Sequence, residues 1–261
     1  MGVERIQGIE HIILWILVAL ALVSFASSLY KTNAYGRHMR GDERFTLPAL
    51  PGWLLFECPQ WWAFAATFWG MVAAFPQLSP GASAIVLFGL WQAHYLYRSL
   101  VYPLRMRDRA KRFPLGAALF GFVFNAVNGF VNAVAVITAT HLAGSGWLSD
   151  PRFIGGLIIA VVGWIINCQA DSILIGLRKP GETGYRIPHG GLFRYVSSAN
   201  YLGEIILWCG WALMSFTAAG GVFALFTIAN LLPRALSHHR WYRKHFPDYP
   251  ANRKAIIPGL L

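Results

Sequence analysis

The sequence has few charged residues and few cysteines for its length. Only 13% of its 261 residues are Asp, Glu, Lys or Arg, whereas soluble domains carry about 25%. Hydrophobic residues make up 56%, and the mean hydropathy is +0.47. The three cysteines, Cys58, Cys168 and Cys209, are isolated and odd in number, so they indicate neither a disulfide framework nor a thiol-metal site. This composition argues against an ordinary soluble domain and predicts a polytopic membrane protein.

Motifs of the standard soluble nucleotide-binding folds are also absent. No G-x-x-x-x-G-K-[ST] sequence occurs, and no G-x-G-x-x-G follows a strand pattern. A serine nucleophile elbow is likewise missing. His238 and His239 are adjacent, so on a helix they would point in different directions, and no carboxylate completes a site around them. We therefore expect no metal site.

Apolar runs close to the ~20 residues that cross a bilayer recur along the chain. Since hydrocarbon offers no partners to backbone N–H and C=O groups, these spans should be helices. The first run is expected to be retained rather than cleaved, because further apolar runs follow it. We predict an all-α fold, a single seven-helix membrane domain over residues 1–261, with spans at 9–30, 52–75, 80–102, 115–142, 151–176, 197–217 and 219–233.

Lysines and arginines gather in alternate connections between the predicted spans. They are frequent after the first, third, fifth and seventh spans, and absent from the connecting stretches PQLSP and TAAGG. Because basic loops stay on the cytosolic side, the N-terminus should lie outside and the C-terminus inside. This bias also explains the net charge of +11, and no nucleic-acid partner is expected, although a basic cytosolic face would suit a polyanionic ligand.

Polar side chains inside the predicted spans mark candidate sites, because a mid-bilayer charge costs about 2.5–3.5 kcal/mol on insertion scales. Glu57 lies in the aromatic stretch WLLFECPQWWAF. Burial disfavours the charged form of a carboxyl, so we expect Glu57 either to be protonated, sharing a hydrogen bond with a phenol, or to make a helix-end contact. In the third span we single out His94 and Tyr95.

Three further sets of polar residues have helical spacing. Asn167 and Asp171 are four residues apart, as are Asn200 and Glu204, so each pair shares a helix face. The two pairs flank the polar loop RKPGETGYRIPHGG, and we interpret them as a ligand site. The third set shares a face of the fourth span and suits hydrogen bonds between helices: Asn125, Asn128 and Asn132.

Longer blocks carry a family resemblance. The stretch NCQADSILIGLRKPGETGYRIPHGGLFRYVSSANYLGEIILWCGWAL, from Asn167 to Leu213, resembles the C-terminal region of the steroid 5α-reductase (3-oxo-5α-steroid 4-dehydrogenase) family, as does the terminal PRALSHHRWYRKHFPDYPANRKAIIPGLL. YGRH, the Trp53-x-x-x-Glu57 pair and HYLYRSLVYP resemble family landmarks in the N-terminal half. The order of the blocks separates the chain from isoprenylcysteine methyltransferases. Departures from the family pattern are His189 and Ser237.

The resemblance implies NADPH-dependent reduction of the C4–C5 double bond of a 3-oxo-Δ4-steroid to a 5α-dihydrosteroid. Glu57 and Tyr95 would polarise the 3-keto oxygen while hydride reaches C5, and Trp53 would form a wall of the substrate site. By the same resemblance, residues 1–110 hold the substrate and 160–261 the cofactor. The implied NADPH-binding residues are Arg109, Asn167, Asp171, Arg178, Tyr185, Asn200, Glu204, His238 and Tyr242.

Two other functions remain open at this point. One is an enoyl-thioester reductase of the same superfamily, acting on long acyl-CoA. The other is a sterol-binding or transport protein without chemistry. In every case the partners are the lipid membrane and an apolar substrate entering from it, and a monomer is expected. A bacterial inner membrane is favoured over the endoplasmic reticulum, because no Lys-rich retrieval signal or long leader is present.

Overall fold

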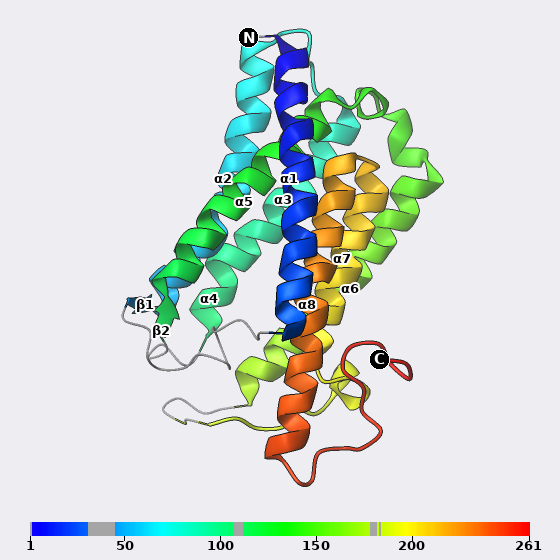
Figure 1. Cartoon of the computed structure of the whole chain (residues 1–261). Coiled ribbons are helices and arrows are strands. Elements are labelled where there is room, and N and C mark those ends of the chain that lie inside the picture. Colours follow the sequence, from blue (N-terminus) through cyan, green and yellow to red (C-terminus); the bar gives the residue numbers. More distant parts are fainter. Residues whose placement is uncertain (1, 31–44, 107–111, 178–181, 183) are drawn as a thin grey trace.

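The computed structural model describes residues 2–30, 45–106, 112–177, 182 and 184–261, and it is mostly helical (Figure 1). The helices are α1 (Val3–Tyr30), α2 (Ala49–Ala74), α3 (Ala82–Leu96), α4 (Tyr102–Arg105), α5 (Leu115–Thr138), α6 (Pro151–Gly176), α7 (Ala199–Ser215) and α8 (Ala218–His245). A π-helix at Tyr97–Val101 joins α3 to α4, and short 3-10 turns occur at Thr140–Leu142, Gly146–Ser149 and Gly191–Arg194. The expected all-α architecture is supplemented by a two-stranded antiparallel ribbon of β1 (Thr46–Pro48) and β2 (Arg112–Pro114), with Thr46 opposite Pro114.

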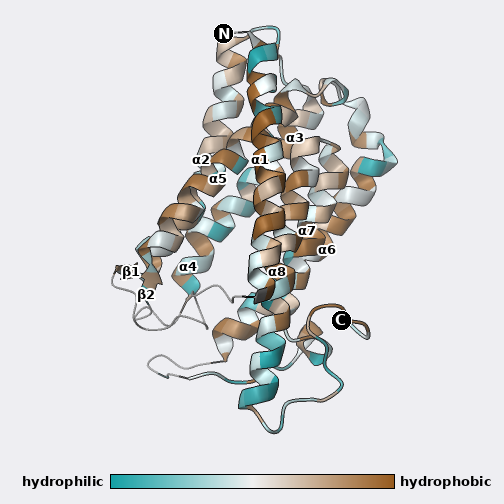
Figure 2. Ribbon diagram, viewed as in Figure 1, coloured by the Kyte–Doolittle hydropathy of each residue, from teal (hydrophilic) through white to brown (hydrophobic). Residues whose placement is uncertain are grey.

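Each of the seven predicted spans coincides with a long helix. Four helices in the described part of the chain, α1, α5, α6 and α8, are long and apolar enough to cross a membrane. The chain is therefore an integral membrane protein, while seven crossings and the outside N-terminus stay predictions. Figure 2 shows the apolar colouring along the bundle, with hydrophilic residues concentrated at the end of α8 nearest the C-terminal segment.

The seventh predicted span was too short. We expected it to end at 233, but α8 continues through Pro233 to His245 and is 28 residues long. A proline inside a helix removes one backbone hydrogen bond without necessarily ending the helix when packing supports both sides. Here Pro233, Arg234 and Ala235 are all buried. Residues 234–245, which lie beyond the predicted span, thus form the C-terminal part of α8.

The bundle is built from pairs of closely packed helices. The α6 and α7 helices pack most extensively, followed by α2 with α5, while α8 packs against α7 and α1. Between these pairs lies an aromatic core around Trp91. The centroid of the Trp91 ring is 4.7 Å from that of Phe64 and 4.8 Å from that of Trp211. Two of the three asparagines of α5 make interhelical hydrogen bonds, as expected: Asn125 Nδ2 donates to Phe56 O on α2, and Asn132 Oδ1 accepts from Trp211 Nε1 on α7 at 3.1 Å. Asn128 instead accepts from Asn132 Nδ2 within α5.

The α6–α7 contact is made by four glycines, spaced seven apart on each helix. A Cβ atom on Gly163 would lie 2.3 Å from Leu207 N, and one on Gly210 would lie 2.4 Å from Ala160 N. Gly156 and Gly203 are equally close to the opposite backbone. Small residues allow helix backbones in a membrane to approach closely, and here the two backbones touch. This contact places Asn167 of α6 directly beside Gly203 of α7.

The start of α6 is fixed by a capping aspartate. The Asp150 carboxylate accepts from Arg152 N at 2.8 Å and from the Arg152 guanidinium at 2.8 and 2.9 Å. Hydrogen bonds from the Arg152 side chain and backbone lower the pKa of Asp150 to about 2. The cap is therefore charged at neutral pH, as favoured at a helix N-terminus.

Adding a methyl group at the glycine contact should destabilise the protein. In Gly163→Ala the new Cβ meets backbone that cannot rotate away, so the helices must separate, at a cost of about 1–3 kcal/mol. The measurement is the midpoint of thermal unfolding of the detergent-purified protein, followed by tryptophan fluorescence. Gly155→Ala on the same helix is the control, since nothing lies within 4 Å of its added Cβ. Equal midpoints for the two variants would contradict a glycine-dependent contact.

Candidate active site

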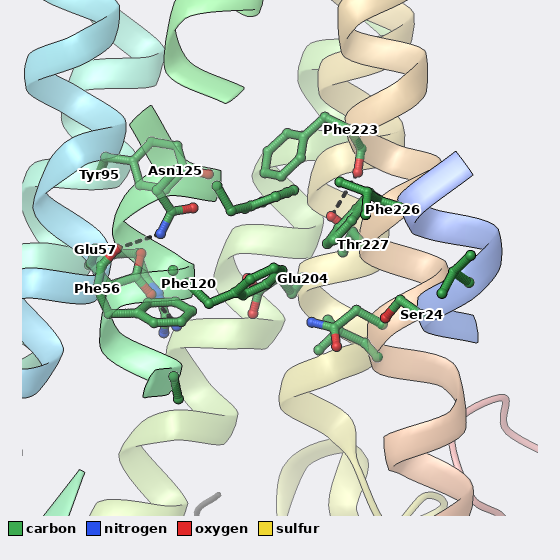
Figure 3. A pocket seen from close by; sticks show the side chains of 18 of the residues that line it. Ser24, Phe56, Glu57, Tyr95, Phe120, Asn125, Glu204, Phe223, Phe226 and Thr227 are labelled. Atoms are coloured by element: carbon green, nitrogen blue, oxygen red, sulfur yellow. Dashed lines mark hydrogen bonds and ion pairs between the residues drawn. The ribbon is translucent and has the colours of Figure 1, made fainter. Parts of the chain in front are cut away.

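A cavity of about 550 Å³ lies among α1, α2, α3, α5, α7 and α8. Most of its lining is apolar, with Phe56, Phe120, Phe124, Phe223 and Phe226 supplying aromatic rings. Its polar side chains include Glu57, His94, Tyr95, Arg98 and Glu204, drawn from four separate segments of the chain. Figure 3 shows Tyr95, Asn125 and Glu57 at one side, Phe226 and Thr227 at the other, and Glu204 between them. The cavity thus combines a long apolar volume with a small group of ionisable side chains.

Glu57 and Tyr95, the two predicted catalytic residues, line this cavity together. Both are buried, Glu57 on α2 and Tyr95 on α3. The Tyr95 hydroxyl oxygen accepts a hydrogen bond from Gln60 Nε2 at 2.9 Å, and the Tyr95 ring stacks on Trp208 with centroids 5.5 Å apart. Because Gln60 is the donor in this contact, the phenolic hydrogen of Tyr95 remains available to another acceptor.

Arg98 is a site residue that sequence reasoning missed. It is buried in the π-helix, where Nη1 donates to Asp171 Oδ2 at 3.0 Å and Nη2 lies 3.6 Å from Glu57 Oε1. A charge inside an apolar run was the signal available, since HYLYRSLVYP contains Arg98 at its centre. A π-turn inserts one extra residue per turn and is frequent at functional sites. Arg98 therefore connects the Glu57 side of the site to α6.

Two aromatic rings enclose the Arg98 guanidinium. Its central carbon lies 5.2 Å from the Trp53 ring centroid and 4.8 Å from that of Tyr102. Trp53 Nε1 also donates to the Arg98 carbonyl at 2.9 Å. We predicted Trp53 to be a wall of the substrate site, but it does not line the cavity and instead covers Arg98. A cation–π contact of this kind holds the guanidinium in place.

The predicted polar pairs on α6 and α7 do come together. Asn167 Nδ2 donates to Asn200 O at 2.9 Å, and Asn200 Nδ2 lies 3.5 Å from Asp171 Oδ1. Glu204, one turn beyond Asn200, reaches the cavity itself. Asp171 also binds Arg98, so the pairs form one continuous polar cluster with Glu57.

The remaining predicted cofactor residues lie elsewhere or outside the described residues. Arg109 and Arg178 fall outside the ranges that the structure describes. The Tyr185 ring packs edge to face on Trp241 with centroids 5.0 Å apart, and the His238 and Tyr201 ring centroids are 5.4 Å apart. Tyr242 is buried and stacks on Tyr249 at 5.2 Å. These last three are at the hydrophilic end of α8 and do not line the cavity. Among described residues, no group of three His, Cys, Asp or Glu side chains could hold a metal.

Charge counting suggests which carboxyl carries a proton. Among the described residues, the buried carboxyls of Glu57 and Asp171 both approach one guanidinium, that of Arg98, and the half-buried Glu204 lines the same cavity. Burying an unpaired charge is costly, so a single guanidinium does not fully compensate two buried, ionised carboxylates. Asp171 has the hydrogen-bonded contact with Arg98 at 3.0 Å, whereas the Glu57 contact is longer at 3.6 Å. The geometry therefore favours a neutral Glu57 with a hydrogen to donate.

Removing Arg98 alone should be more damaging than removing it with its partner. Arg98→Met leaves Asp171 buried without its cation, a loss of about 3–5 kcal/mol for such pairs. Adding Asp171→Asn removes the stranded charge and should restore part of the stability, which thermal unfolding in detergent would measure. Arg152→Met, in an exposed ion pair, is the control and should change the midpoint little. A double variant no more stable than Arg98→Met would contradict the pairing.

Comparison with known proteins identifies the family of the chain. Residues 111–261 match the family model described as 3-oxo-5-alpha-steroid 4-dehydrogenase. The chain is 40% identical over 243 residues to 3-oxo-5-alpha-steroid 4-dehydrogenase 1 of Bos taurus, covering 93% of each chain. The Homo sapiens protein of that name is 38% identical over 242 residues, covering 93% of this chain and 92% of its own. Steroid 5-alpha-reductase DET2 of Solanum lycopersicum is 37% identical over 258 residues, covering 97% and 98%. The family model and these relatives show that the chain belongs to the 3-oxo-5-alpha-steroid 4-dehydrogenase family of oxidoreductases.

Proposed function

We propose that the chain reduces the C4–C5 double bond of 3-oxo-Δ4-steroids to 5α-dihydrosteroids with NADPH. The observation that carries the proposal is that Glu57 and Tyr95 line the same largely apolar cavity. Family membership supports the reaction class, since the relatives are named as 3-oxo-5-alpha-steroid 4-dehydrogenases.

The cavity suits a flat, apolar substrate that arrives from the bilayer. Its volume of about 550 Å³ is within the range of small-molecule sites, ~300–1,000 Å³. Leu20 and Val23 of α1 and Phe120 of α5 line the cavity and are also exposed at the surface, by 41%, 64% and 60%. An opening between α1 and α5 would admit a steroid directly from lipid.

At the reacting end, Tyr95 would donate its phenolic hydrogen to the 3-keto oxygen. Reduction of the conjugated double bond moves negative charge onto that oxygen, so a donor already aimed there lowers the barrier. A neutral Glu57 would supply a second donor beside the first. Gln60 donates to the Tyr95 oxygen at 2.9 Å and would hold the phenol in place during the step. A proton added at C4 then completes the saturated ketone.

The polar cluster has donors and acceptors suited to NADPH. Amides, carboxylates and arginine can bind the carboxamide, ribose hydroxyls and phosphates of such a cofactor without a Rossmann turn. The Ser198 hydroxyl, next to α7, is buried with no hydrogen-bond partner among the described residues, as a ligand-binding group would be. When bound, NADPH supplies the hydride that reaches C5. The residues we propose to hold it are Asn167, Asp171, Asn200, Glu204, Tyr185, His238 and Tyr242, together with Arg109 and Arg178.

Loss of either proposed donor should reduce turnover strongly. Tyr95→Phe and Glu57→Gln should each lower the kcat for progesterone by about 10²-fold or more, the usual effect of losing an oxyanion donor. The assay follows 5α-dihydroprogesterone formed with NADPH by the detergent-purified protein, with the C5 configuration scored. Tyr97→Phe, two residues away and outside the cavity lining, is the matched control. Unchanged turnover in both donor variants would overturn the proposal.

The same preparation distinguishes the other two functions. An enoyl-thioester reductase would oxidise NADPH with a trans-2-enoyl-CoA and leave progesterone unreduced. A sterol-binding or transport protein would bind steroid without binding NADPH. Either result would replace the proposed steroid reduction.

Gln60 should act by positioning Tyr95. In Gln60→Leu the phenol loses its donor at 2.9 Å, and kcat should fall about tenfold with little change in KM, in line with one lost hydrogen bond. A merely structural role would instead lower the amount of folded enzyme and leave kcat per active site constant. Titration of NADPH-binding sites in each preparation separates the two outcomes. Gln92→Leu on α3, which removes a hydrogen bond to Trp61 O outside the cavity, is the control.

A further inference from the structure

A second cavity lies on the other side of Trp91 and Trp208, between α3, α6 and α7. Its volume is about 280 Å³. His94 is the one residue that lines both this cavity and the Glu57–Tyr95 cavity. The second cavity is therefore separate from the proposed reaction site but shares a wall with it.

The lining of the second cavity is flat and apolar. Four indole rings contribute to it, those of Trp91, Trp164, Trp208 and Trp211. The N–H groups of Trp91 and Trp211 already donate to Gln60 O and Asn132 Oδ1, so these rings present apolar surface to the cavity. Val161 and Trp164 are 43% and 40% exposed, which places the mouth on the outer surface of the α6 helix. Such a site would be filled from the lipid.

His94 is the only ionisable side chain of this lining, and it lacks a partner. Its Nδ1 atom is buried without a hydrogen bond to any described residue. A buried polar nitrogen left unpaired costs free energy, and native proteins usually satisfy such atoms. Inside the second cavity a water molecule would find no other ionisable side chain, whereas it needs two to four polar partners. An oxygen atom on an apolar ligand would satisfy the imidazole.

We propose that the second cavity binds a sterol or steroid, with its single terminal hydroxyl or keto oxygen bonded to His94. An acyl chain of a membrane lipid fits less well, because its methyl end would reach His94 and leave the nitrogen unpaired. A rigid fused-ring body matches the indole walls, while the one polar end matches the one polar side chain. This binding does not depend on the proposed reduction.

The position of His94 connects the two cavities. Its ring lies edge to face against Tyr95 at 4.9 Å and against Trp208 at 5.0 Å, and Trp208 stacks on Tyr95. A ligand bonded to His94 would restrict the rings that hold the proposed donor. The second site is thus placed to modulate turnover.

The test is photolabelling with a cholesterol analogue that carries a diazirine on its ring system. The protein is reconstituted in phosphatidylcholine nanodiscs without NADPH, irradiated and mapped by mass spectrometry. We expect label on Leu157, Ala160, Val161 and Trp164 of α6, which line only the second cavity, and competition by excess cholesterol. Label that cholesterol does not compete would show ordinary lipid contact and overturn the proposal.

Substitutions then separate the two cavities. Ala93 is exposed and lines only the second cavity, so Ala93→Trp should block it and lower α6 labelling by about tenfold, equivalent to ~1.4 kcal/mol, with progesterone turnover unchanged. Ala66→Trp, at an exposed position of α2 that lines neither cavity, should keep full labelling. His94→Phe keeps the ring contacts but loses the nitrogen, and should reduce labelling about fivefold. Labelling that survives both Ala93→Trp and His94→Phe would exclude the site, whether or not the enzyme reduces steroids.

Discussion

The buried guanidinium of Arg98 is the interaction on which the site depends. It binds Asp171 of α6 at 3.0 Å and approaches Glu57 of α2 at 3.6 Å. A charge in the interior of a membrane protein is stable only with partners, so these carboxyls stabilise the buried guanidinium and with it the fold. One interaction thereby fixes the relative positions of α2, the π-helix and α6, and it leaves Glu57 as the carboxyl that can carry a proton.

The glycine contact between α6 and α7 supplies the other half of this arrangement. Because Gly163 and Gly203 let the two backbones touch, Asn167 and Asn200 can hydrogen bond at 2.9 Å across the interface. Bulkier residues at these positions would separate the helices and break the polar cluster before any ligand bound. The glycine contact and the ion pair of Arg98 therefore both help to position the polar cluster. The glycine contact brings Asn167 to Asn200, and Arg98 holds Asp171.

Part of this site could be predicted from the sequence. The four-residue spacing of Asn167 with Asp171 was enough to place both on one face of a helix, and the structure joins them to Asn200 as expected. The pairing of Glu57 with Tyr95 is different, because residues on separate helices have no spacing rule; it came from the family resemblance. The positions of the helices were predicted, but the length of α8 was not. A proline is a weak signal for the end of a helix when the residues around it are buried, as they are at Pro233.

The role of Arg98 was beyond sequence reasoning for a physical reason. Helical periodicity assumes a constant 3.6 residues per turn, and the π-helix at Tyr97–Val101 breaks that assumption at the arginine itself. The polar cluster also lies where the apolar cavity ends, with Glu204 and Arg98 belonging to both. Groups of opposite charge therefore meet where the apolar lining ends. The π-helix at Tyr97–Val101 removes Arg98 from regular helical spacing, and it also places Arg98 at this boundary.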